Sequence, residues 1–83
     1  MKELIRLCDI EPNEHATVHA LKNDGPMRRR LYDLGLIEDT VVECVGKSPM
    51  GDPAAYLIRG AVIAIRRADS AQIIVELRGQ TWD

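Results

Sequence analysis

The 83-residue sequence contains no phenylalanine, and its three aromatic side chains are Tyr32, Tyr56 and Trp82. A chain of this length forms one domain with a small hydrophobic core. Because so few aromatic side chains are available, we expect valine, isoleucine, leucine and alanine to build that core.

An excess of basic charge is also missing. The 11 lysines and arginines are outnumbered by 13 aspartates and glutamates, so the net charge is −2. Proteins that bind nucleic acids in general depend on many basic side chains to neutralise phosphates. The balance therefore argues against a nucleic-acid partner, although the arginines can still cluster locally.

Long hydrophobic runs are absent as well. Charged residues interrupt the first ten positions, where a signal peptide would need an apolar segment. No stretch approaches the roughly 18 apolar residues that span a bilayer. We therefore expect a cytoplasmic protein without membrane insertion. Cys8 and Cys44 form no CxxC pair, and in that compartment we expect reduced thiols.

Most of the chain has the character of short β-strands. Residues 15–21 alternate, with Ala16, Val18 and Ala20 on one side and Thr17, His19 and Leu21 on the other. β-Branched and other apolar residues predict four more strands at 40–45, 54–59, 61–66 and 72–77. Gly60 falls between two of them and predicts a tight hairpin or a bulge.

One helix is predicted between the first two strands. Asp24 can cap it, and Pro26 suits its first turn. Its apolar stripe consists of Met27, Leu31 and Leu34. Gly35 supplies the left-handed residue that ends a helix. A further single helical turn is expected at 67–71, after the fourth strand.

These elements predict a mainly all-β fold, a partly open barrel of about five strands with a short helical insertion. A doubly wound sheet would need regular alternation of strands and helices, which this chain lacks. The expected domain covers residues 1–77, and residues 78–83 are predicted to be a disordered tail.

No residue pattern predicts catalysis. Gly46-Lys47-Ser48 resembles the end of a phosphate-binding loop, but the required earlier glycine is replaced by Val41, and Pro49 follows instead of a helix. Neither a nucleophile with its base nor a recognisable pair of carboxylates is present. We expect no enzymatic activity and no cofactor. Asp52, between a glycine and a proline, is interpreted as a turn-forming residue.

Metal binding has weak support in the sequence. His15 and His19 would lie about 13 Å apart on a strand, too far to share an ion whose bonds to imidazole nitrogen are about 2 Å long. We expect both histidines at the surface. Either cysteine could join one histidine in a labile site, but Cys44, in a valine-rich strand, is more typical of a buried thiol.

The arginine run predicts a protein-binding face. Arginine and tyrosine are enriched at binding hot spots, and Tyr32 lies one helical turn beyond Arg28. The alternative is a solvated outer face of the helix without a partner. The candidate partner-binding residues are Arg28, Arg29, Tyr32, Met50 and Asp52.

Four segments together resemble the FeoA family, ferrous iron transport protein A, over the range 7–77. They are Leu7-Cys8-Asp9-Ile10-Glu11-Pro12-Asn13-Glu14, the run from Arg28 to Leu36, Pro49-Met50-Gly51-Asp52-Pro53, and the run from Gly60 to Arg67. The resemblance implies an SH3-like barrel with a helical insertion. It also implies a non-catalytic partner of the ferrous iron permease FeoB, one that binds the permease's cytosolic GTPase region. A further alternative is a weak homo-oligomer, because the open edge of a barrel can pair with a second copy.

The resemblance also implies an alternative, because the same domain forms the C-terminal part of metal-responsive repressors of the DtxR type. In that case the protein would be a metal-binding or metal-sensing module. Three positions depart from the family pattern. Asn13 and Asp39 stand where glycine is usual, and both tolerate left-handed geometry. Ala61 replaces a larger residue, which predicts a thinner core or a surface hollow. The family has no settled metal-ligand motif to carry over.

Overall fold

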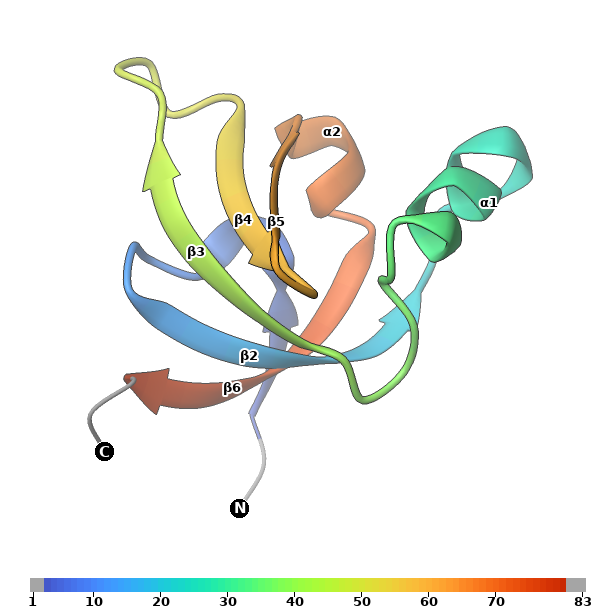
Figure 1. Ribbon diagram of the computed structural model, residues 1–83, viewed down its shortest axis with the longest axis horizontal. Helices are drawn as coiled ribbons and strands as arrows, with labels where there is room; N and C mark the ends of the chain where they lie inside the picture. The colour runs from blue at the N-terminus through green and yellow to red at the C-terminus, as the bar shows by residue number, and fades with distance from the viewer. Residues whose placement is uncertain (1–2, 81–83) are drawn as a thin grey trace.

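The computed structural model describes residues 3–80, and these form one curved antiparallel sheet with three short helical segments (Figure 1). The six strands are β1 (Leu4–Arg6), β2 (Glu14–Leu21), β3 (Val41–Lys47), β4 (Ala54–Ile58), β5 (Ala61–Ile65) and β6 (Ile73–Gln80). The helical segments are the 3₁₀ turn η1 (Leu7–Asp9), α1 (Gly25–Asp33) and α2 (Arg67–Ser70). The strand order is β1-β6-β2-β3-β4-β5, so β1 and β5 are the two edges of a partly open barrel.

The predicted mainly-β fold is confirmed, with one strand more than expected. β1 has only three residues and pairs with β6, Leu4 opposite Glu76 and Arg6 opposite Ile74. So short an apolar run has no recognisable period in the sequence, and its partner lies at the other end of the chain.

Aliphatic side chains fill the core, as expected, together with one aromatic residue. Tyr56 on β4 is 1% exposed, and its hydroxyl donates to the carbonyl oxygen of Leu7 over 3.4 Å. Burial raises the pKa of Tyr56 to about 12, because the phenolate would lose its hydration. Fully buried aliphatic residues come from strands far apart in the chain, among them Val18, Val42, Ile58, Ile73 and Val75.

A β-bulge in β2 overturns the predicted alternation at the end of that strand. Val18 lies opposite Val75 but Ala20 lies opposite Ile74, so β2 contains one extra residue at His19. The bulge reverses the phase of the side chains. Leu21 is therefore buried like Ala16 and Val18, while Ala20 is exposed, so the predicted grouping of Ala20 with Ala16 and Val18 is wrong.

β6 is longer than predicted. It runs to Gln80, which pairs with Glu14 of β2, so the hydrogen-bonded ladder continues past the expected boundary at residue 77. Residues 78–80 thus belong to a strand, and 81–83 of the predicted tail lie outside the described residues. The predicted hairpin is confirmed. Arg59 (φ 51°) and Gly60 (φ 86°) form a two-residue turn with both φ values positive, as a type I′ turn requires.

The predicted left-handed residues are found where expected. Asn13 has φ 76° and Asp39 has φ 75°. Gly35 (φ 105°) ends α1 in a Schellman motif, in which its N–H bonds the carbonyl of Tyr32 over 2.9 Å and the next N–H, of Leu36, bonds the carbonyl of Leu31 over 3.0 Å. Leu31 and Leu36 are both buried, which anchors this end of the helix.

Two details of the predicted helix are wrong. Asp24 occupies the N-cap with an extended backbone, but its side chain makes no capping hydrogen bond. Leu34 was expected to face the core with Met27 and Leu31, yet it is 36% exposed. Leu34 is the C-cap residue, where the chain leaves the helix, so the 3.6-residue period no longer sets its direction.

Candidate functional site

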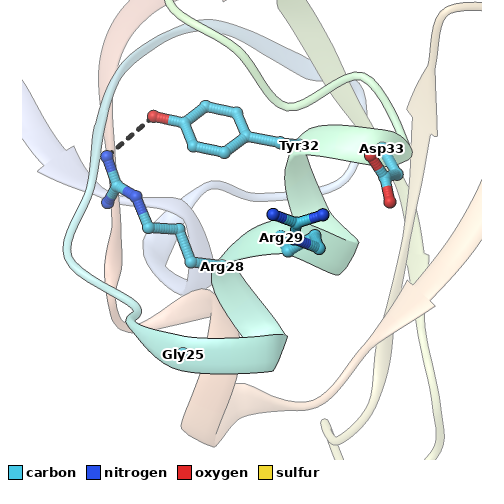
Figure 2. A pocket seen from close by; sticks show the side chains of 5 residues that line it. All are labelled: Gly25, Arg28, Arg29, Tyr32 and Asp33. Carbon is cyan, nitrogen blue, oxygen red and sulfur yellow. Dashed lines mark hydrogen bonds between the residues drawn. The ribbon is translucent and has the colours of Figure 1, made fainter.

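The Arg28 side chain joins α1 to the end of β2. One guanidinium nitrogen, Nη1, donates to the carbonyl oxygens of Leu21 and Asn23, and the other, Nη2, donates to the hydroxyl of Tyr32 over 2.8 Å. The guanidinium carbon also lies 4.9 Å from the centre of the Tyr32 ring, in cation–π range. Figure 2 shows the two side chains meeting at their tips. Arg28, predicted as a free docking residue, is thus half-buried and committed to internal contacts.

Arg29 and Tyr32 remain available on the same side of α1. Arg29 is exposed and Tyr32 is 39% exposed. With Arg28, Gly25 and Asp33 they line a shallow hollow of about 420 Å³ (Figure 2). The structure therefore brings three of the five predicted contact residues together on one helix.

The other two predicted residues lie elsewhere. Met50 and Asp52 belong to the loop between β3 and β4, on the opposite side of the molecule from α1 (Figure 1). Met50 is 92% exposed, the highest value among the large apolar residues of the described chain. Asp52 Oδ1 accepts the backbone N–H of Arg67 over 2.9 Å, at the first residue of α2. Its carboxylate thus satisfies a free helix amide, as an N-cap does.

The candidate metal ligands do not gather. Cys8 and Cys44 are buried free thiols, and burial raises the pKa of Cys44, which disfavours its thiolate. Within residues 3–80, no three His, Cys, Asp or Glu side chains are arranged to hold an ion. His19 is exposed as expected, but His15 is half-buried and lies 3.4 Å from Glu43, its Nε2 to Oε1. The prediction of a surface position for His15 is wrong because β3 pairs alongside it.

An apolar groove lies between α1 and β5, where the sequence predicted no more than a hollow at Ala61. Two adjoining hollows of about 310 and 450 Å³ share Leu34 and Ile63 as lining residues. We call them together the α1–β5 groove. Its signal in the sequence was the small residue Ala61, which is exposed and lines the larger hollow, so the expected surface hollow is present.

Three arginines also line this groove: Arg30, Arg59 and Arg66. All three are exposed. None of them lies within 4.0 Å of an acidic group of the described residues. The chain as a whole is acidic, so this is a local concentration of free basic charge.

In the part of the chain that the structure describes, no helix has the length and apolar character needed to cross a membrane.

Comparison with known proteins identifies the family. The model of the FeoA domain matches residues 5–77, most of the chain. The chain belongs to the FeoA family. A curated relative from Porphyromonas gingivalis, the Fe(2+) transport protein A/Fe(2+) transporter FeoB fusion protein, is 29% identical over 73 residues. That match covers 88% of this chain but 9% of the fusion protein, so the chain corresponds to a small part of it.

Solved structures show the same fold. The FeoA-like protein from Clostridium acetobutylicum is 30% identical, with a TM-score of 0.85, and the match covers 98% of this chain and 94% of that one. The zinc complex of FeoA from Stenotrophomonas maltophilia, described as an SH3 domain protein, has a TM-score of 0.77 at 23% identity, over 86% of this chain and 88% of that one. The SH3-like class predicted from the sequence is confirmed.

A regulator shares the fold as well. A manganese-dependent transcriptional repressor has a TM-score of 0.81 at 15% identity, and the match covers 94% of this chain and 44% of the repressor. At this identity the similarity concerns the fold alone.

Proposed function

We propose that this FeoA-family protein is a non-catalytic, cytoplasmic accessory protein of bacterial ferrous iron uptake. In this proposal it binds the cytosolic GTPase region of a FeoB-like permease. One observation carries the proposal: in Porphyromonas gingivalis a related domain and FeoB are parts of a single chain. Two domains joined in one chain have a high effective concentration relative to each other. A protein of this family that is a separate chain needs a binding surface to reach the same proximity to the permease.

The proposed contact surface is the outer side of α1, and Met50, at the loop tip on the opposite side of the molecule (Figure 1), is proposed as a separate second contact. Tyr32 offers a partly exposed ring whose position is set by Arg28, and Arg29 offers an uncommitted guanidinium. Rigid aromatic rings and arginines commonly dominate binding energy. Arg28 and Asp52 were predicted from the sequence as contacts. In this proposal they act indirectly, because Arg28 holds α1 in place and Asp52 holds α2 in place.

Binding to the purified cytosolic region of the organism's own FeoB-like permease, measured by calorimetry, tests the proposal. Y32A and R29E should each weaken binding about tenfold or more, since truncating a hot spot costs at least about 1–2 kcal/mol. R78E, on the exposed surface of β6, is the matched charge control and should bind like the wild type. A lack of association, together with normal ferrous iron uptake in a strain without this protein, would exclude the proposal.

The alternative function, a metal-binding or metal-sensing module, is supported by the fold alone. Titration of the reduced protein with ferrous iron or zinc separates the two. Saturable binding that is lost in C44A or H15A would favour the metal module, and heat signals equal to those of buffer would remove it.

A further inference from the structure

The outer edge of β5 is an open strand edge. β5 pairs only with β4 among the described strands, and it stands at the end of the sheet. In a hairpin with a two-residue turn, the pairs Ile58–Ala61 and Tyr56–Ile63 exchange the hydrogen bonds. The N–H and C=O groups of Val62 and Ala64 therefore point away from β4. No backbone group of the described residues bonds them from the other side.

The α1–β5 groove runs along this edge. Its smaller hollow is lined by four consecutive residues, from Ile63 to Arg66, and by Met27, Leu31 and Leu34 of the helix side. Side chains of a strand alternate between the two faces of a sheet. A hollow lined by consecutive residues of a strand thus lies beside its edge, where the unpaired groups of Ala64 point. The larger hollow continues the groove toward the hairpin turn.

The walls of the groove combine apolar and basic character. Leu34 is 36% exposed at the point shared by the two hollows. Arg30, Arg59 and Arg66 are free of acidic partners, while Asp33 and Asp69 also line the walls, which leaves basic charge in excess. A ligand complementary to this groove has backbone groups to offer β5, apolar side chains for its floor and carboxylates for the arginines.

We propose that the α1–β5 groove binds an extended acidic segment of a partner polypeptide, which adds to β5 as a seventh strand. Strand addition of this kind gains affinity from main-chain hydrogen bonds and specificity from alternate side chains. The bonding groups are the amides of Val62 and Ala64. The inference goes beyond the transporter proposal, because it concerns the edge of β5 and requires only a peptide. The groove shares Tyr32 and Asp33 with the hollow at Arg29, but its arginines and its backbone groups are different ones.

A second copy of this chain is a poorer occupant than an acidic peptide. Symmetric pairing of two β5 edges would bring the same three arginines of both copies to one interface. Like charges placed opposite each other across paired strands are destabilising. The charge of the groove thus favours a different, acidic chain.

The test uses the full-length ¹⁵N-labelled protein and a synthetic capped hexapeptide of alternating glutamate and valine. Its addition should shift the amide signals of Val62 and Ala64 and slow their hydrogen exchange by about tenfold, as expected for newly bonded amides. The matching lysine–valine peptide should bind more weakly. A glutamate–valine peptide with alternate N-methyl groups should not bind, because it lacks the donors that a strand requires.

Two variants test the two halves of the inference. R30E/R66E should weaken the acidic peptide roughly tenfold and improve the lysine peptide, while R29E, on the other hollow, should change neither. Ala64→Pro removes an N–H that points away from β4, which an edge strand tolerates. In this variant the peptide should no longer slow hydrogen exchange at the amide of Val62.

Three results would overturn the inference. The first is no shift of the β5 amide signals at millimolar peptide, and the second is equal binding of the glutamate and lysine peptides. The third is hydrogen-exchange protection of the Val62 amide that rises with protein concentration in the absence of peptide. The last would show a second copy on the edge. Loss of permease binding with retained peptide binding would separate this site from the transporter proposal.

Discussion

The side chain of Arg59, at the β4–β5 turn, lies directly over the backbone of Gly35, at the end of α1. A β-carbon at position 35 would overlap Cδ of Arg59 and come within 3.1 Å of its Cγ. Gly35 therefore serves two purposes, since it adopts the positive φ of the Schellman motif and makes room for the arginine stem. The two residues lie side by side at one wall of the α1–β5 groove.

Gly35→Ala should destabilise the protein by about 1–3 kcal/mol, because alanine is strained at φ 105° and must also displace Arg59. Urea unfolding measures the loss. Gly25→Ala (φ 63°, no atom within 4 Å) carries the backbone strain without the clash, and Gly46→Ala carries neither. Equal stability of the Gly35 and Gly46 variants would contradict this account.

Arg28→Ala should cost about 2 kcal/mol of stability, since it leaves the carbonyl of Leu21 without its charged donor. Arg29→Ala, one position along the helix, should change stability by less than about 0.5 kcal/mol. Arg28→Lys should fall between the two, because an ammonium group lacks the planar fork that reaches Leu21 and Tyr32 together. Denaturant midpoints for the three variants provide the measurement, and similar losses for positions 28 and 29 would refute the bracing role of Arg28.

Tyr56 should make the protein less stable at high pH. Its pKa is about 12 when folded and about 10 in an unfolded chain. The folded state thus holds a proton that the unfolded state releases, so stability is fully present below pH 10 and decreases as the pH rises through 12, by about 2–3 kcal/mol in all.

Urea unfolding from pH 8 to pH 11.5 tests this dependence. Tyr56→Phe should flatten it, whereas Tyr32→Phe, at a partly exposed ring, should retain the wild-type slope. An unchanged slope in the Tyr56 variant would show that another group is responsible.

Local backbone chemistry was predictable from the sequence. Gly35 ends its helix, Gly60 forms its hairpin, and Asn13 and Asp39 adopt left-handed geometry, because each conformation depends on residues within a few positions. The features that were missed depend on distant partners. The bulge at His19 is defined by its pairing with β6, and β1 exists only because β6 lies beside it.

The candidate site shows the same limit. Arg28, Arg29 and Arg30 look equivalent in the sequence, yet one is committed to a β2 carbonyl, one faces the shallow hollow in Figure 2, and one lines the α1–β5 groove. Sequence spacing could place all three on a helix. It could not distinguish them, since the groups that each one faces come from elements before and after the helix in the chain.

The pairing of β1 with β6 has a consequence for how this domain can be used in larger proteins. The first and last strands of the described chain are antiparallel neighbours, at the opposite end of the sheet from β5. Additional polypeptide joined at either terminus would emerge beside its counterpart and leave the helix-side hollows uncovered. Such an arrangement suits attachment to another protein, as in the Porphyromonas gingivalis fusion.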